Sequence, residues 1–257
     1  MTDSPAQPTH ALARPNHIEL GDGTQIQILH EDRSVIAIDK PPGWMLVPHT
    51  WQKTNRNLQA AIVSSIAAGD FWARSRNLTF LRNIHRLDAE TSGVLLFGRS
   101  NGAVESIGRL FESRQMSKSY LVVVHGTPPA QEWTCRDPIA PDPKEIGRMK
   151  VDFREGKNAE THFRILQAGA KATLLEAQPV TGRTHQIRIH LLAGGHPVVG
   201  DELYGPPIKK APKSEVRLGL RSVFLGYMDP FTRRPTRIEA PAGEFLREFR
   251  FAPLAKG

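Results

Sequence analysis

The sequence predicts an α+β protein with a mixed, largely antiparallel central sheet, helices beside it and a catalytic cleft. Short β-branched runs and amphipathic segments are interspersed without the regular βαβ alternation of a doubly wound fold. The 257 residues are enough to bury a substantial core, and no internal repeat is visible. Because proline and polar residues dominate the start, we expect a tail over residues 1–17 and one domain over residues 18–257.

Four segments of the first half show strand or helix patterning: strands over 35–38 and 94–97, and helices over 57–68 and 101–115. The first strand ends at a Pro-Pro-Gly stretch, which is typical of a turn. Asn55 or Asn57 can cap the first helix with its side chain.

The second half predicts strands over 118–126, 160–167 and 172–178, and a helix over 184–192 that ends at a pair of glycines. Two proline-rich stretches, 127–150 and 205–217, are expected to be long loops. Loops of this length in compact domains tend to be functional or mobile.

The net charge indicates an anionic partner. Thirty-four Lys and Arg residues against 26 Asp and Glu residues give a net charge of +8 and a pI near 9.9. A basic surface attracts phosphates, so nucleic acid is favoured over a charge that serves solubility alone.

The sequence argues against several kinds of site and several classes of protein. A single cysteine, Cys135, allows neither an internal disulfide nor a cysteine-based metal site. His185 and His190 are five residues apart, so they do not share one helical face as paired metal ligands do. The sequence has no P-loop or dinucleotide spacing, no secretory signal and no apolar stretch that could span a bilayer. We therefore expect a cytoplasmic protein without a metal or cofactor.

A charged cluster adjoins a predicted buried strand in NIHRLDAETSGVLLFGRS, residues 83–100. Asp88 follows Arg86 by two residues and lies close to this strand. An isolated Asp here would more often cap the turn with Thr91 and Ser92. Burial of the carboxylate would raise its pKa, so a nucleophilic Asp88 requires a cationic partner.

A second cluster, TGRTHQIRIHL, can supply that cation. Arg183 lies just ahead of the predicted helix, and Gln186 and His190 share a helical face. The helix start also offers free N–H groups for a phosphate or a carboxylate. A solvated basic helix is the alternative interpretation.

With these clusters placed, the chain resembles the RluA-type pseudouridine synthases. The resemblance rests on colinear motifs that cover roughly residues 30–255: IDKPPGW (38–44), HRLDAETSG (85–93), KSYLVVVHG (118–126), GRTHQIRIHL (182–191), GDELYG (200–205) and LGLRSVFLGYMDPFT (218–232). Motifs of this length in this order are highly specific.

The resemblance implies isomerisation of uridine to pseudouridine in structured ribosomal or transfer RNA by a monomer, with no cofactor and no metal. It implies that Asp88 is the catalytic carboxylate and that Arg183 is its ion-pair partner. Tyr120 would stack on the base and assist proton transfer, and Arg86 would fill the space of the extruded uridine. Extrusion is required because an enzyme cannot reach a stacked base. The remaining polar residues of the second cluster, Gln186 and Arg188, are expected to bind RNA.

Two features depart from the family pattern. Members often carry an N-terminal S4 RNA-binding domain, and the residues before IDKPPGW are too few for one. Arg221 and Ser222 stand where members commonly have a Leu-His-Ala stretch, which puts local packing or substrate contacts in doubt.

Two other functions are compatible with the same charge. A non-catalytic RNA-binding module would need no acidic residue in a basic cleft, so Asp88 argues against it. An N-glycosidic hydrolase usually uses two carboxylates, and Glu90 is the one nearby candidate for the second.

Overall fold

The computed structural model describes residues 14–46, 56–207 and 217–254. Its helices are Leu58–Ala68 (α1), Phe71–Arg74 (α2), Asn101–Glu112 (α3), Gln186–Ala193 (α4) and Gly243–Glu248 (α5). The strands of the first half are His17–Glu19 (β1), Gln25–Glu31 (β2), Val35–Lys40 (β3), Arg82–Asn83 (β4), Ser92–Gly98 (β5) and Ser117–His125 (β6). Those of the second half are Glu132–Cys135 (β7), Ile139–Pro141 (β8), Met149–Val151 (β9), Thr161–Ala168 (β10), Ala172–Pro179 (β11), Leu220–Met228 (β12) and Pro235–Glu239 (β13).

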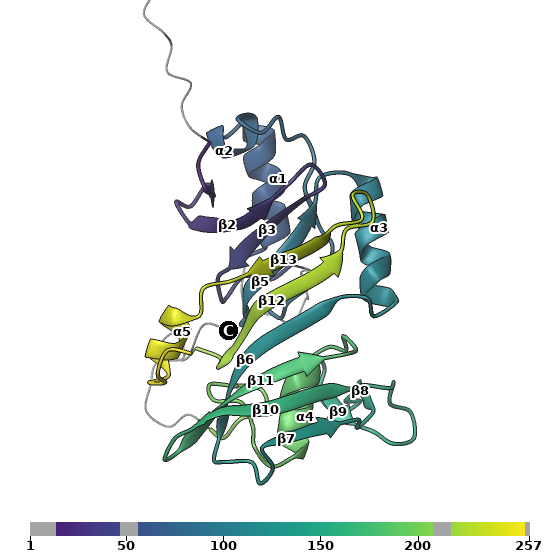
Figure 1. Ribbon diagram of the computed structural model, residues 1–257, viewed down its shortest axis with the longest axis vertical. Coiled ribbons are helices and arrows are strands. Elements are labelled where there is room, and N and C mark those ends of the chain that lie inside the picture. The colour runs from purple at the N-terminus through teal and green to yellow at the C-terminus, as the bar shows by residue number, and fades with distance from the viewer. Residues whose placement is uncertain (1–13, 47–55, 208–216, 255–257) are drawn as a thin grey trace, which may run out of the picture.

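One sheet of 11 strands crosses the whole molecule (Figure 1). Its main order is β1-β2-β3-β5-β12-β6-β11-β10-β7, with β4 on β5 and β13 on β12. All of these neighbours are antiparallel except β5 and β12, which pair in parallel. The predicted α+β class with a mixed, largely antiparallel sheet is confirmed.

Strand β12 occupies the centre of the sheet although it lies late in the sequence. It separates the earlier strands β5 and β6, as the yellow-green arrow between two teal ones in Figure 1 shows. Its register places Ser222 opposite Gly93 of β5 on one side and Tyr120 of β6 on the other. The C-terminal part of the chain therefore joins two segments that carry motifs.

The predicted helices are present, with small differences at their ends. Asn57 caps α1 by accepting the N–H of Ala60 at 3.0 Å, as the sequence allowed. Helix α3 ends at Glu112, three residues before the predicted end, and Arg114 then takes a left-handed φ of 60°. Helix α4 begins at Gln186 and not at residue 184, because His185 has a left-handed φ of 55°.

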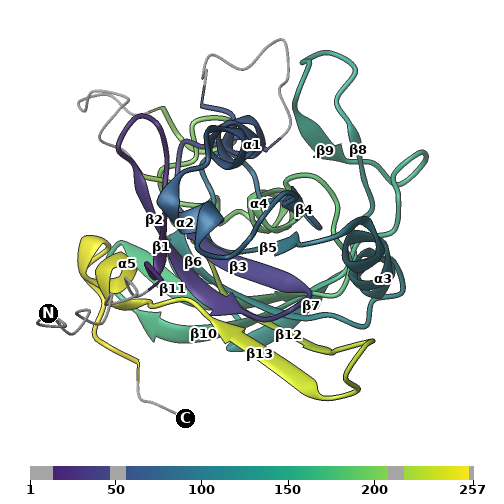
Figure 2. The same ribbon diagram turned by 90° about the horizontal axis from the view of Figure 1, so that it is seen from above.

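The stretch 127–150 is not the continuous loop that was predicted. Its strand β7 extends the main sheet by pairing with β10, and β8 and β9 form a separate hairpin. Seen from above, this hairpin projects on the same side of the sheet as α1 and α4 (Figure 2).

The other predicted irregular segments are described only in part. Residues 14–17 do not belong to a loose tail, because the carbonyl of Pro15 accepts from Arg76 at 2.7 Å and β1 begins at His17. The predicted tail otherwise lies outside the described residues, as do residues 208–216 of the second proline-rich loop.

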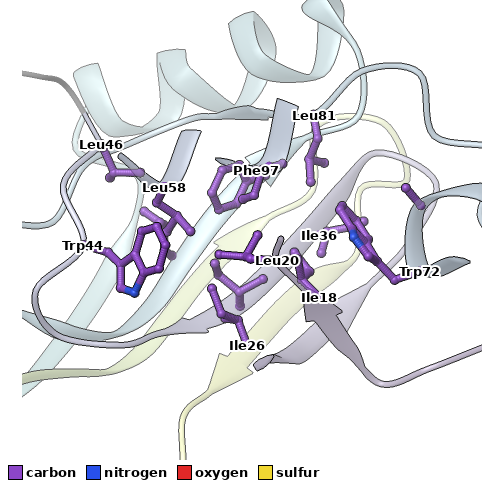
Figure 3. Packing of buried hydrophobic residues seen from close by; sticks show 14 of the residues in the cluster. Ile18, Leu20, Ile26, Ile36, Trp44, Leu46, Leu58, Trp72, Leu81 and Phe97 are labelled. Carbon is purple, nitrogen blue, oxygen red and sulfur yellow. The ribbon is translucent and has the colours of Figure 1, made fainter. Parts of the chain in front are cut away.

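Apolar side chains cover both faces of the sheet. On one face, residues of β1, β2, β3 and β5 pack against α1 and α2; Figure 3 shows Ile36 and Phe97 near Leu58 and Trp72. A second cluster, which includes Val94 and Ile107, places α3 against the opposite face of β3 and β5. Strand β5, which follows the Asp88 turn, is consequently buried on both faces. No helix in the described ranges is long and apolar enough to cross a membrane.

Candidate active site

A cavity of about 120 Å³ lies where the turn before β5, strand β6 and the start of α4 meet. All six residues that the sequence analysis singled out line it: Arg86, Asp88, Tyr120, Arg183, Gln186 and Arg188. The two clusters predicted to cooperate are therefore brought together, although their contacts differ from the predicted ones.

Asp88 pairs with Arg188, not with Arg183. The guanidinium of Arg188 donates to Asp88 Oδ2 at 3.2 Å, and His185 Nε2 lies 3.8 Å from the same oxygen. Arg183 forms no ion pair within the described ranges; its Nε donates to the carbonyl of Asn158 at 2.9 Å. Arg183 precedes the left-handed turn at His185, whereas Arg188 lies on the buried side of α4. The predicted partnership of Arg183 and Asp88 is thus wrong.

A second carboxylate holds Arg188 in place. Nε and Nη2 of Arg188 donate to Asp201 Oδ2 and Oδ1, each at 2.7 Å. The Asp201 side chain has no exposed surface, and its Oδ1 also accepts the N–H groups of Leu203 and Tyr204. Paired, planar hydrogen bonds of this kind restrict a guanidinium in position and orientation. Arg188 is only 5% exposed, so the structure does not support the predicted RNA contact.

The side chain of Gln186 is also fully hydrogen-bonded within the protein. Its Oε1 accepts from the Thr181 hydroxyl and the Arg183 N–H, and its Nε2 donates to the Glu160 carbonyl and the Thr161 hydroxyl. The side chain uses its polar atoms to shape the loop ahead of α4. The prediction that Gln186 binds RNA is contradicted by these contacts.

The charge of Asp88 is stabilised in spite of its burial. Burial alone would raise the pKa of this carboxyl, but His185, Arg188 and Arg86 together bring the pKa below the ordinary 3.8. Burial also lowers the pKa of His185 below 6.5, so the ring is neutral at pH 7. Arg188 is therefore the permanent cation in contact with Asp88, and the carboxylate is ionised near neutral pH.

Tyr204 connects His185 to the β8–β9 hairpin. Its hydroxyl accepts the N–H of Met149 at 2.9 Å and lies 2.7 Å from His185 Nδ1. A hydroxyl that accepts one hydrogen bond can donate its own proton to Nδ1, which favours a proton on the His185 Nε2 that faces Asp88. The Arg188 guanidinium lies over the Tyr204 ring, 4.9 Å from its centre.

Tyr120 enters the cavity from β6. Burial, together with the charge of Asp88, raises the pKa of its phenol to about 12, and an interaction with Ser222 opposes this shift only in part. Ser222 is the cross-strand partner of Tyr120 on β12. The hydroxyl is therefore protonated over the whole physiological pH range and can donate a hydrogen bond or a proton.

Arg86 is the exposed cation of the group. It lines the cavity beside Asp88 but, within the described ranges, forms no ion pair with a carboxylate. Its guanidinium is available to a ligand at the cavity mouth, which agrees with its predicted place in the site.

Lys40 was not predicted as a site residue, although it lies within the motif IDKPPGW. This lysine is fully buried, and its ammonium donates to the carbonyls of Pro41, Ala89 and Thr91 at 3.1, 2.7 and 2.8 Å. Burial lowers its pKa to about 7, against the effect of Glu90 and Asp88. Lys40 fixes the backbone on both sides of Glu90 and so holds the turn that carries Asp88. Charge inside a buried strand was the signal that could have found it.

The departure at Arg221 and Ser222 has a structural explanation. Arg221 donates to Asp39 at 2.6 Å, to the hydroxyl of Ser92 at 3.2 Å and to the carbonyl of Pro241, which ties β12 to β3 and β5. A Cβ atom on Gly93 would lie 1.9 Å from the Ser222 carbonyl oxygen, so only glycine fits there. This pair of residues therefore joins β12 to the strands that flank the site.

The arrangement combines an ionised, largely buried carboxylate with a protonated phenol and several cations around one small cavity. Such a carboxylate can act as a nucleophile or a base, and the phenol can assist proton transfer. No cluster of three or more His, Cys, Asp or Glu residues suited to a metal ion occurs in the part of the chain that the structure describes.

Comparison with known proteins identifies the family. Residues 34–193 match the family model for RNA pseudouridylate synthase. Ribosomal large subunit pseudouridine synthase C of Escherichia coli (strain K12) is 34% identical over 226 residues, which span 86% of this chain and 67% of the relative. The uncharacterized RNA pseudouridine synthase YlyB of Bacillus subtilis (strain 168) is 32% identical over 244 residues, 94% of this chain and 78% of the relative.

A solved structure shows the same fold. Human RNA pseudouridylate synthase domain containing 1 superposes with a TM-score of 0.65 and 26% identity, covering 84% of this chain and 83% of its own. The chain therefore belongs to the RNA pseudouridylate synthase family, in its RluA-type branch. It is an RNA pseudouridine synthase, as the motifs predicted.

Proposed function

We propose that the enzyme isomerises a uridine of large-subunit ribosomal RNA and that Asp88 is its catalytic residue. The ribosomal substrate is inferred from the relatives named for it, and transfer RNA is the alternative outcome of the test. One observation carries the catalytic assignment: the Asp88 carboxylate is kept ionised by Arg188 inside a cavity that Tyr120 also lines.

The isomerisation replaces the bond between C1′ and N1 of the uridine by one between C1′ and C5. In the proposed mechanism, Asp88 either attacks C1′ or removes a ribose proton while the N-glycosidic bond breaks. Tyr120 stacks on the base. Because its hydroxyl stays protonated, it assists the transfer of the C5 proton as a relay, which accepts that proton while its own proton passes on towards N1. Arg188, not Arg183, stabilises the charge of Asp88.

The uridine must leave its stack to reach the cavity, since a base inside a helix is inaccessible to enzymes of this kind. We propose that the exposed side chain of Arg86 fills the space in the RNA that the extruded uridine leaves. Its planar guanidinium can stack on the neighbouring bases and pair with phosphate. Unstacking requires a few kcal/mol, which such contacts offset.

We further propose that residues 18–257 act as one catalytic domain in the cytoplasm, as a monomer and without a metal or cofactor. The sheet that runs without interruption from β1 to β7 supports the single domain. The basic charge supports RNA binding by this domain itself.

The test measures pseudouridine formation in transcripts of large-subunit ribosomal RNA and of transfer RNA, with the wild type and Asp88→Asn. Pseudouridine in ribosomal RNA from the wild type alone is the expected result. Activity confined to transfer RNA would replace the proposed substrate, and turnover by Asp88→Asn would remove Asp88 from the chemistry. Release of free uracil would indicate the hydrolase alternative, because an isomerase releases none.

A further inference from the structure

Lys118 is a cation of the cavity to which the mechanism above gives no role. It lies two residues before Tyr120 on β6, and alternate residues of a strand face the same side. Both side chains line the cavity. Lys118 therefore lies in the same cavity as Tyr120, on the same side of β6.

The Lys118 ammonium has fewer hydrogen-bond and ion-pair partners in the protein than a buried charge normally has. Its Nζ donates to the carbonyl of Thr181 at 3.2 Å, and within the described ranges no carboxylate lies within ion-pair distance of it. An ammonium has three donors, so two remain for a ligand. A buried charge is costly unless it is paired, and burial accordingly lowers the pKa of Lys118 to about 8.

The neighbouring charged groups do not supply the missing anion. Asp88 is already paired with Arg188. His85, which senses the charge of Lys118, has a pKa lowered to about 3 by burial and is neutral. The other charged groups that line the cavity, Arg86 and Arg183, are cations. Within the described ranges, therefore, no group of the protein pairs with the Lys118 ammonium, and a bound anion can fill this place.

We propose that Lys118 binds an anionic oxygen of the target nucleotide, supplied by its phosphate or by its uracil ring. The inference rests on the proposed function. When the bond between C1′ and N1 breaks, its electron pair stays with uracil and spreads over O2 and O4. This charge disappears when C5 bonds to C1′, the C5 proton is lost and N1 gains a proton. A phosphate, by contrast, is charged throughout.

The experiment compares Lys118→Gln and Lys118→Arg with Lys171→Gln, which changes an exposed lysine on the β10–β11 turn. The RNA is whichever class the wild type modifies, so that the substrate proposal is tested separately by the wild type alone. For each variant, the dissociation constant is measured at several salt concentrations, and the single-turnover rate is measured at saturating RNA.

We expect Lys118→Gln to lose at least tenfold in rate or affinity, Lys118→Arg to recover part of the loss, and Lys171→Gln to match the wild type. If the ligand is phosphate, the slope of log Kd against log salt falls by about 0.7 for one lost contact with single-stranded RNA. If it is the uracil ring, the rate falls and this slope does not change.

Two results would overturn the proposal. One is a Lys118→Gln protein whose rate and affinity both lie within twofold of the wild type. The other is an equal loss in Lys118→Gln and Lys118→Arg with a lowered melting temperature, which would mean that Lys118 only supports the loop at Thr181.

Discussion

Arg188 donates to Asp88 at 3.2 Å with one arm of its guanidinium, while Asp201 holds the other. The charge of the Asp88 carboxylate is thus stabilised by a buried side chain of α4, which is held in position by the protein alone. Preorganised charge of this kind needs no rearrangement when substrate binds.

The pair predicts a pH dependence. In the wild type the pKa of Asp88 lies below 3.8, so the carboxylate is charged at neutral pH. Arg188→Met removes the permanent cation, and burial then raises this pKa. We expect low activity near neutral pH that recovers as the pH rises and ionises Asp88 again. Rate–pH profiles of single turnover provide the measurement.

Arg183→Met is the matched control for that experiment, because Arg183 lines the same cavity without contacting a carboxylate in the described ranges. It should show no new pH dependence. Similar profiles for the two variants would mean that Arg188 does not control Asp88. Arg188→Met also leaves Asp201 unpaired, a loss that typically costs about 3–5 kcal/mol, so folding is checked by thermal unfolding.

Asp201→Asn tests the positioning of Arg188 while retaining a side chain of the same shape. The amide cannot accept two hydrogen bonds from the guanidinium as the carboxylate does, so Arg188 gains freedom. We expect a reduced single-turnover rate and a Kd for RNA within threefold of the wild type, since Asp201 is buried. Equal losses in rate and affinity would place Asp201 in RNA binding instead.

The lowered pKa of Asp88 should also be visible in the free energy of unfolding at acidic pH. A group whose folded pKa lies below its unfolded value stabilises the fold above about pH 4, and that contribution is lost as the pH falls. The stability advantage of the wild type over Asp88→Asn should be constant near neutral pH and shrink below about pH 4. Urea unfolding at several pH values measures it, and a difference that grows in acid would contradict the lowered pKa.

Tyr120→Phe keeps the ring and removes the hydroxyl. Because burial raises the pKa of this phenol to about 12, ionisation of Tyr120 cannot shape the activity of the wild type between pH 6 and about pH 10. We expect unchanged RNA affinity and a single-turnover rate lowered at every pH in this range. A rate equal to that of the wild type would remove the hydroxyl from the mechanism.

Gly93 is expected to tolerate no side chain. Its φ is +107°, and an added Cβ would lie 1.9 Å from the backbone oxygen of Ser222. Gly93→Ala should therefore destabilise the protein by about 3 kcal/mol or more, since β5 and β12 must separate. Gly102→Ala, in α3 with nothing within 4 Å, is the control and should be neutral or stabilising. Equal melting temperatures would show that the two strands can move apart.

Site residues could be predicted from the sequence where they occupy a fixed position within a motif. Asp88 and Tyr120 line the cavity as expected because each lies at a fixed place in a turn or a strand. The choice between Arg183 and Arg188 could not be made, because it depends on the left-handed backbone at His185, which is unusual for a residue other than glycine.

Long-range contacts limited the prediction of the fold in the same way. The sequence patterning indicated β3, β5, β6, β10 and β11, five of the thirteen strands in the described residues, and local patterning does not determine which strands become neighbours. The parallel pairing of β12 with β5, and with it the contact of Arg221 with Asp39, joins residues that are far apart in sequence. Asp201 likewise belongs to the motif GDELYG, yet only the tertiary structure shows that its carboxylate binds Arg188.

The central position of β12 affects when the enzyme can become active during its synthesis. A nascent chain that has left the ribosome only as far as α4 already contains Asp88, Tyr120 and Arg188, but it lacks the strand that joins β5 to β6. Strand β5, which follows the Asp88 turn, and strand β6, which carries Tyr120, then have no common sheet, and the backbone groups that β12 would pair with lack these partners. The complete site can therefore form only after β12 has been translated.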